Sequence, residues 1–190
     1  MSEQVSREEF DELRRDVQEL QDRADIRDCL VRYCRGIDRL DWDLAETAYH
    51  PDAIDNRGAI TANPKEYLAW SRLNIEPASW TSHNLSNITY DIAGDTAHTE
   101  TYVMTFVGSP DEREVTIGGA RYISRFERRD GEWRLIRQET AMDYRFTANA
   151  EQLPDAALRG RRNRTDRSYD RPLDLTDEAR ARYEAMPGRG

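Results

Sequence analysis

The sequence predicts an α+β fold in which a curved, mostly antiparallel sheet wraps around N-terminal helices. Before about residue 75, apolar side chains recur at steps of three and four, the spacing of one helix face. From about residue 81 they alternate with polar residues, as in half-buried strands. Asp130 and Gly131 stand between two alternating runs and are a strong hairpin signal. Helices gathered before an antiparallel sheet are typical of this fold class.

The first helix is expected to begin at a capping box, Ser6 to Glu9. A narrow apolar stripe follows at helical spacing, made of Phe10, Leu13, Val17 and Leu20. Because its flanks are charged, residues 1–22 are predicted to form an amphipathic helix that packs against one neighbour, such as another subunit. A second helical run continues from it with little interruption and ends between Gly36 and Asp41; it contains Ile26, Leu30, Tyr33, Cys34 and Ile37.

Two shorter helices are expected next. Asp41 can cap a short helix that Pro51 would stop, with apolar positions at Trp42, Leu44, Ala45 and Tyr49. Asn63 and Pro64 supply an N-cap and a first-turn proline for a third helix, with apolar positions at Tyr67, Leu68, Trp70 and Leu73.

Four long antiparallel strands are predicted from the alternating region. Their alternating residues are Ile88, Tyr90 and Ile92, then Tyr102, Met104 and Phe106, then Tyr122 and Phe126, then Trp133 and Leu135. Turns at residues 93–95 and 130–131 separate them. One further short strand is expected near residues 52–58.

The chain is long enough for one core with appendages, since a domain usually has roughly 100 to 200 residues. Its charged residues are concentrated at both ends, which leaves an ordinary globular centre. We therefore expect a domain over 1–146 and an Arg-rich C-terminal extension over 147–190, with a helix at 177–185. The extension is either a solvated arm or a segment that contacts another subunit or covers a pocket.

Composition and motifs exclude several classes of function. A net charge of −9 argues against a general nucleic-acid or acidic-membrane binder. No apolar run approaches the ~18 residues of a membrane span, so we expect a soluble, cytoplasmic protein. Cys29 and Cys34 are interpreted as small core side chains. No metal-binding motif is present, and Gly118 and Gly119 do not lie in a nucleotide-binding pattern, so no metal or cofactor is expected.

Asp38 is the first candidate for chemistry. It extends the row of Leu30 and Cys34 by another four-residue step, so a carboxylate projects from an otherwise apolar helix side. Burial and the helix C-terminus would both raise the pKa of Asp38 towards that of a general base. The alternative is that the chain has already turned and that Asp38 is a surface loop acid.

The three histidines differ in their surroundings. His50 precedes Pro51 and is interpreted as a helix-end or loop residue, and His98 as an exposed strand residue. His83 lies at a strand start, where it is either a pocket residue or a structural histidine. His83, together with Asp38 and Tyr33, is suited to proton transfer rather than to covalent or metal chemistry.

These residues lie in segments that resemble the SnoaL-like branch of the nuclear transport factor 2-like superfamily. The similar segments are Leu20 to Asp28, Tyr33 to Asp43, Tyr49 to Asp55, Thr81 to Asn87, and Gly119 to Trp133. The resemblance covers about residues 8–146 and implies a cone-shaped α+β barrel with an interior pocket. The branch includes scytalone dehydratase, bile-acid 7α-dehydratase and hexachlorocyclohexane dehydrochlorinase.

The resemblance implies an Asp-His pair that acts as a general base. The family positions fall on Asp38 and His83, with Tyr33 as the group that polarises or protonates a departing oxygen. This chain departs from the family pattern at two places. Ser82 replaces the first of a usual pair of histidines, and the last strand reads Arg137, Gln138, Glu139 where relatives often carry His-Arg-Thr. Glu139 either adds a charge to the pocket or pairs with Arg137 outside it. The substrate-binding candidates are Asn87, Tyr102, Tyr122, Trp42, Arg137 and Glu139.

The function implied is that of a cofactor-independent lyase acting on a hydrophobic, aromatic or polycyclic small molecule, in keeping with the catabolism of aromatic compounds. The preferred reaction is a dehydration-type elimination. A retro-aldol-like C–C cleavage, for example formaldehyde release from a phenolic, is a variant. The alternatives are an isomerase or cyclase, a non-catalytic ligand-binding protein, or a protein like the small subunit of dioxygenases. A homo-oligomer is expected, a trimer in preference to a dimer.

Overall fold

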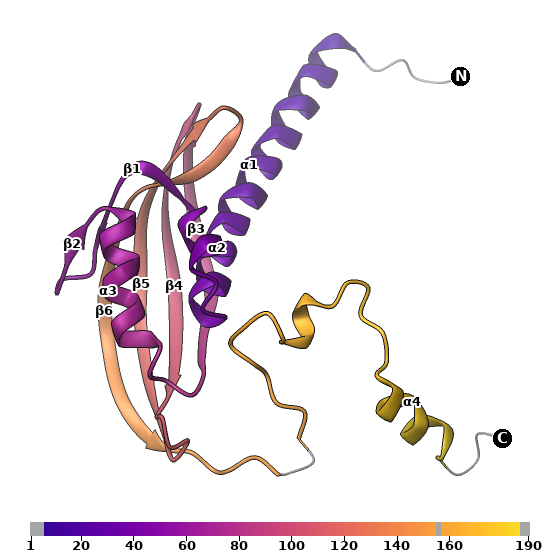
Figure 1. Cartoon of the computed structure of the whole chain (residues 1–190). Helices are drawn as coiled ribbons and strands as arrows, with labels where there is room; N and C mark the ends of the chain where they lie inside the picture. The colour runs from indigo at the N-terminus through magenta and orange to yellow at the C-terminus, as the bar shows by residue number, and fades with distance from the viewer. Residues whose placement is uncertain (1–5, 155–156, 187–190) are drawn as a thin grey trace.

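The computed structural model describes residues 6–154 and 157–186, and it has helices on one side of a single six-stranded sheet (Figure 1). The helices are α1 (Arg7–Asp38), α2 (Trp42–Glu46), α3 (Pro64–Ile75) and α4 (Asp177–Glu184), with a 3₁₀ turn, η1, at Arg167–Tyr169. The strands are β1 (Tyr49–Asn56), β2 (Thr61–Ala62), β3 (Thr81–Ala93), β4 (Thr96–Gly108), β5 (Glu114–Arg129) and β6 (Glu132–Asn149). The predicted α+β class, with four long strands after the helices, is confirmed.

The sheet is open and mixed, with the strand order β2-β1-β6-β5-β4-β3. Strands β3 to β6 form an antiparallel meander, whereas β1 pairs with β6 in parallel. The sheet curves around α3 and the C-terminal half of α1, as Figure 1 shows. Its concave face therefore supplies one wall of the interior, and the two helices supply the other.

The two periodic runs of the N-terminal region form one helix, α1. The capping box is present, since Ser6 and Glu9 bond to each other's backbone N–H groups. The described residues before Asp22 are exposed, and α1 projects beyond the sheet (Figure 1). Asp22 marks the start of packing, because it accepts hydrogen bonds from Trp133 Nε1 at 2.9 Å and from Arg128 Nη1 at 2.6 Å. The buried side chains of α1 all follow from that point.

The region after α2 differs from the prediction. The short helix ends at Glu46, and Tyr49, His50 and Pro51 belong to β1 rather than to a helix and its stop. His50 is buried, and its Nε2 lies 2.9 Å from the carbonyl oxygen of Glu127. The prediction was wrong because the apolar spacing of so short a run fits a helix and a strand equally well. Pairing with β6 decides in favour of the strand.

The C-terminal extension docks on the domain through Arg162. Its guanidinium donates to the backbone carbonyls of Asp38 at 3.3 Å, Ile75 at 3.0 Å and Ala78 at 2.6 Å. These carbonyls lie at or just beyond the C-terminal ends of α1 and α3, where carbonyl groups lack helical partners. Part of the extension is therefore a docked segment, whereas the described residues of α4 include no buried side chain.

None of the helices in the described ranges is long and apolar enough to span a membrane. Cys29 and Cys34 are both buried, as expected for core residues. Burial raises the pKa of the Cys29 thiol to about 11, so it stays protonated and inert at neutral pH.

Candidate functional site

A cavity of about 350 Å³ lies between α1, α3 and the concave face of the sheet. Its apolar lining comes from Ile37, Trp70, Ile75, Val103, Ala120 and Met142. Its polar lining comes from Tyr33, Arg57, Tyr67, Ser71, Asn74, His83, Thr105, Tyr122, Thr140 and Arg145. An apolar chamber with a few convergent polar groups is the usual form of a small-molecule site. A larger recess of about 580 Å³ beside α2 and β1 holds none of the predicted catalytic residues.

Asp38 and His83 meet at the wall of this cavity. Asp38, the last residue of α1, accepts from the backbone N–H of His83 at 2.9 Å, and its Oδ1 lies 2.7 Å from His83 Nδ1. Both side chains are largely buried, with 14% of Asp38 and 9% of His83 exposed. The expected contact between these two residues is therefore present, and Asp38 is not a free surface acid.

The contact determines which ring nitrogen of His83 can accept a proton. An ionised carboxylate only accepts hydrogen bonds, so Nδ1 carries a proton and donates the hydrogen bond to Asp38. In the neutral ring the lone pair is then on Nε2. His83 lines the cavity and Asp38 does not, whereas both line a second recess of about 420 Å³. The arrangement therefore presents an oriented base to the cavity.

The ionisation of Asp38 differs from the expectation. Burial raises the pKa of its carboxyl, but the hydrogen bonds from His83, and the positive charge of the imidazole when it is protonated, outweigh burial and hold the pKa below its usual range. The predicted rise was wrong because the sequence argument counted the apolar surroundings and the helix end but not the two donors of His83. Asp38 is thus suited to orient an imidazole rather than to act as the base itself.

Tyr33 lies in a cluster of polar groups at the floor of the cavity. It is buried, and its hydroxyl lies 2.6 Å from the hydroxyl of Tyr67 and accepts from Arg57 Nη2 at 2.9 Å. Burial raises the pKa of Tyr33 well above its usual value, although Arg57 opposes the rise. Tyr33 therefore stays protonated and can donate a hydrogen bond.

Arg57 and Asp55 are site residues that the sequence reasoning missed. Asp55 is fully buried, binds Arg57 Nε at 2.5 Å and Nη2 at 2.9 Å, and accepts from Tyr49 at 2.7 Å. Arg57 also donates to Thr140 at 2.7 Å. Its guanidinium packs over the rings of Tyr33, Tyr67 and Tyr122 at 5.5, 4.6 and 5.1 Å. The available signal was the alternation of buried Ala53 with Asp55 and Arg57, which puts an acid and an arginine on one strand face.

The predicted substrate-binding residues divide between the cavity and other surfaces. Tyr122 is buried and lines the cavity. Asn87 is exposed at a bulge of β3, and Tyr102 is 45% exposed on the convex face of the sheet. Trp42 lies under the guanidinium of Arg72 beside α3, at 5.2 Å. These last three residues are not part of the cavity lining.

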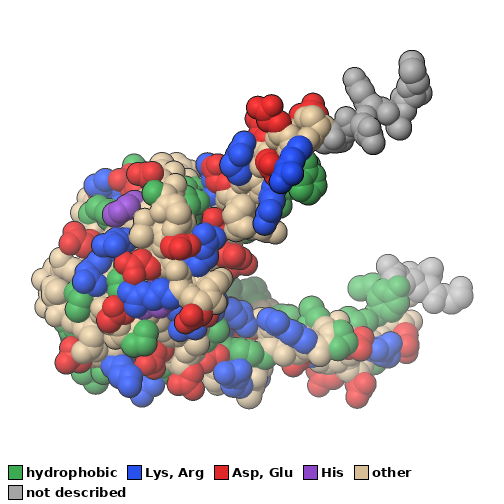
Figure 2. All heavy atoms as spheres, turned by 90° about the horizontal axis from the view of Figure 1, so that it is seen from above, with side chains coloured by type: hydrophobic (Ala, Val, Ile, Leu, Met, Phe, Trp, Pro, Cys, Tyr) green, Lys and Arg blue, Asp and Glu red, His purple; other side chains and the backbone are tan. Residues whose placement is uncertain are grey.

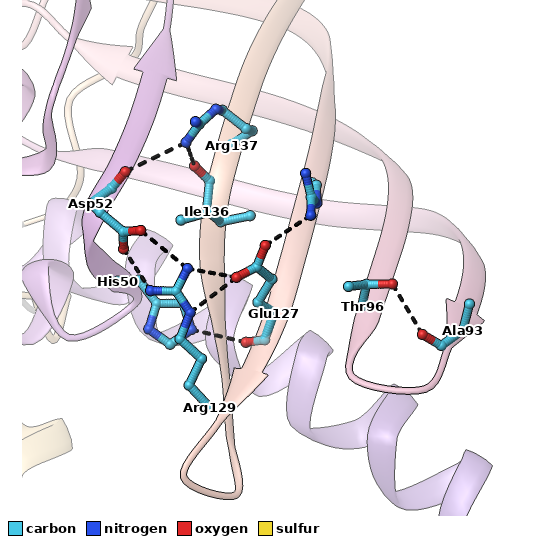
Figure 3. Close-up of polar contacts among 9 residues, drawn as sticks. His50, Asp52, Ala93, Thr96, Glu127, Arg129, Ile136 and Arg137 are labelled. Carbon is cyan, nitrogen blue, oxygen red and sulfur yellow. Dashed lines mark hydrogen bonds and ion pairs between the residues drawn. The ribbon is translucent and has the colours of Figure 1, made fainter.

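Arg137 and Glu139 also lie outside the cavity, both exposed on the outer side of β6. Arg137 donates to the backbone carbonyl oxygens of Ile136 at 2.6 Å and of Asp52 at 3.5 Å (Figure 3). Strict alternation from Trp133 and Leu135 would have turned both residues inward. A bulge at Ile136 shifts the phase, so that Ile136 and the alternate residues after it face inward.

A SnoaL-like domain matches residues 18–139. The chain belongs to this family. The SnoaL-like match covers all lining residues of the cavity that precede residue 140, and it includes Tyr33, Asp38, Arg57 and His83.

The chain is also similar to a curated relative and to solved structures. An uncharacterised protein of Mycobacterium tuberculosis (strain ATCC 25618 / H37Rv) is 31% identical over 128 residues, which cover 64% of this chain and 86% of the relative. Among solved structures, a hexachlorocyclohexane dehydrochlorinase (LinA) Type2 superimposes with a TM-score of 0.67 at 22% identity and covers 75% of this chain and 99% of its own. A putative scytalone dehydratase from Novosphingobium aromaticivorans gives 0.62 at 18% identity, with 74% and 97% covered. At these identities the structures establish a shared fold.

Proposed function

We propose that this protein is a cofactor-independent lyase that removes a proton from a small hydrophobic cyclic or aromatic molecule and expels a leaving group. The observation that carries the proposal is the Asp38–His83 contact at a cavity that His83 lines. The names of two similar structures, a dehydrochlorinase and a putative dehydratase, favour elimination.

In the proposed reaction, His83 Nε2 takes the proton and the electron pair of the broken bond forms the new double bond. The imidazole becomes positively charged, and the ionised Asp38 at 2.7 Å stabilises that charge and holds the ring. The low pKa of Asp38 keeps its charge throughout. The oriented pair therefore stabilises the transition state more than the neutral ground state.

Tyr33 is proposed to assist the leaving group. Its hydroxyl accepts from Arg57, so its own proton is available for Tyr67 or for a departing oxygen in the cavity. Loss of water would use that proton directly. A retro-aldol-like C–C cleavage would instead begin when His83 removes the proton of a substrate hydroxyl group.

An isomerase or cyclase of the same fold is the second candidate function. It is favoured by one observation, the placement of an acid, Tyr33, and a base, His83, in one cavity, since a proton removed at one carbon can be returned at another. A purely ligand-binding role would not require an oriented imidazole with its carboxylate.

A probe reaction tests the base without knowledge of the natural substrate. In 5-nitrobenzisoxazole, removal of one carbon-bound proton breaks the N–O bond and releases a coloured cyanophenolate. We expect the protein to accelerate this reaction and His83→Ala to lose the acceleration, by roughly 100-fold or more. Asp38→Asn should lower the rate as well, because an amide no longer enforces the reactive tautomer.

His98→Ala is the matched control, since His98 is exposed on β4 and should leave the rate unchanged. Circular dichroism and unfolding midpoints would show that each variant is folded. A rate unaffected by His83→Ala in a folded protein would remove His83 from the mechanism. Added imidazole should restore part of the lost rate if the ring itself is the base.

A further inference from the structure

A second bulge in β6 turns Arg145 towards the cavity. Gly119 of β5 pairs with Tyr144, whereas the next residue, Ala120, pairs with Met142, so β6 holds one extra residue at Asp143. Met142 and Arg145 both line the cavity and are both exposed, so they lie at its open end. Bulges of this kind re-aim side chains next to functional sites.

Gly119 accommodates the bulge on the opposite face of the sheet. A β-carbon at this position would overlap the ring of Tyr144, which therefore occupies the space that a side chain would fill. Tyr144 stays on the convex face, stacked with Phe146 at 6.2 Å between ring centroids. The alternation after the bulge then puts Arg145 on the concave face.

The cavity carries one positive charge that has no protein partner in the described ranges. Its lining contains two arginines and no carboxylate. Arg57 is neutralised by Asp55. Asp143, the nearest acid in sequence, pairs with Arg121 at 3.4 Å. The side chain of Arg145 forms no hydrogen bond, ion pair or ring contact with any residue of 6–154 or 157–186.

We propose that Arg145 is an anion-recognition residue and that the ligand of this cavity is a cyclic or aromatic compound bearing a carboxylate. The apolar walls would hold the ring, and the planar guanidinium at the open end would bind the carboxylate through two parallel N–H···O bonds. The inference names the substrate class of the proposed lyase. It rests on the proposed function only in calling this ligand a substrate, since binding of the ligand can be measured separately.

A pair of probes of equal shape tests the inference. Calorimetric titration with 2-naphthoate and with its neutral analogue, 2-naphthamide, measures the preference for a carboxylate. We expect the native protein to bind the carboxylate on the order of 10- to 100-fold more tightly, as for one charge-assisted contact. Arg145→Met should abolish this preference while it leaves the affinity for the amide unchanged. Arg145→Lys should retain part of it.

Arg137→Met is the matched control, because it removes an arginine from the same strand on the outer side. It should keep the full preference. Equal affinities for the two probes in the native protein, or an unchanged preference in Arg145→Met, would overturn the inference. Repeating the titrations in His83→Asn separates the two proposals: a carboxylate preference that persists there supports anion recognition even if the protein proves not to be a lyase.

Discussion

At the scale of single residues, the buried pair of Asp55 and Arg57 supports the site next to Tyr33. Asp55 is fully buried and 11% of the Arg57 side chain is exposed, so neither charge is well solvated. Such a pair adds little net stability over an apolar pair, but loss of one partner leaves an uncompensated buried charge. What the pair secures is the position of the Tyr33 hydroxyl.

Arg57→Met is therefore expected to lower the free energy of unfolding by about 3–5 kcal/mol, because Asp55 remains buried without its partner. Urea titration measures this change. The double variant Asp55→Asn with Arg57→Met should recover part of the loss. Arg129→Met, which breaks an exposed ion pair with Asp52, is the control and should barely move the midpoint. Equal losses in the two single variants would contradict the buried-charge argument.

At the scale of elements, the two bulges of β6 decide which side chains reach the cavity. Alternation predicts a strand well, but each inserted residue reverses the phase of everything after it. The first bulge therefore leaves Arg137 and Glu139 outside, and the second restores the original phase, so that Arg145 lies inside. The contact of α1 with β3 is the other decisive pairing, since it brings the last residue of the helix, Asp38, to His83.

The docked part of the C-terminal extension leads to a prediction about pH. Asp166 accepts from the backbone N–H groups of Arg161 at 2.6 Å and Ser168 at 3.0 Å, and these bonds hold the pKa of its carboxyl at about 2. This pKa is below the usual value near 4, so the stabilising contribution is complete above about pH 4 and is lost as the pH falls through about 2. The local structure around Asp166 should therefore persist through mildly acidic conditions.

Asp166→Asn is expected to loosen the extension at neutral pH, because the amide accepts these hydrogen bonds less strongly. Limited trypsin digestion measures the effect as faster cleavage at the arginines of residues 157–171. Arg162→Ala should act in the same direction, since it removes the contacts to the helix ends. Asp174→Asn is the control and should behave as the native protein. Unchanged cleavage in both test variants would show that these contacts do not hold the segment.

At the scale of the whole molecule, the N-terminal part of α1 and the C-terminal extension project on the same side of the domain (Figure 2). The apolar stripe of the projecting helix is largely exposed: Phe10 59%, Leu13 59%, Val17 43% and Leu20 66%. Exposed apolar stripes of this kind indicate a contact with another chain. The homo-oligomer, with a trimer preferred over a dimer, stays a prediction.

Light scattering at micromolar concentration measures the oligomeric state. We expect a mass above that of the monomer, and we expect Leu13→Arg with Val17→Arg to lower it, because two charges would be buried in the contact. Glu12→Gln with Asp16→Asn changes the net charge by the same amount on the polar flank and should leave the mass unchanged. A monomeric native protein would contradict the prediction.

The sequence by itself determined the α+β class, the four long strands and the Ser6 cap, and the family resemblance implied the pairing of Asp38 with His83. These depend on local periodicity, on capping residues and on motifs that a single chain displays. Only the tertiary structure decided the low pKa of Asp38, the burial of Asp55 with Arg57, and the outward positions of Arg137 and Glu139. Each of these depends on a partner distant in sequence or on a bulge, because neither contacts across the sheet nor an inserted residue change the local pattern of apolar and polar residues.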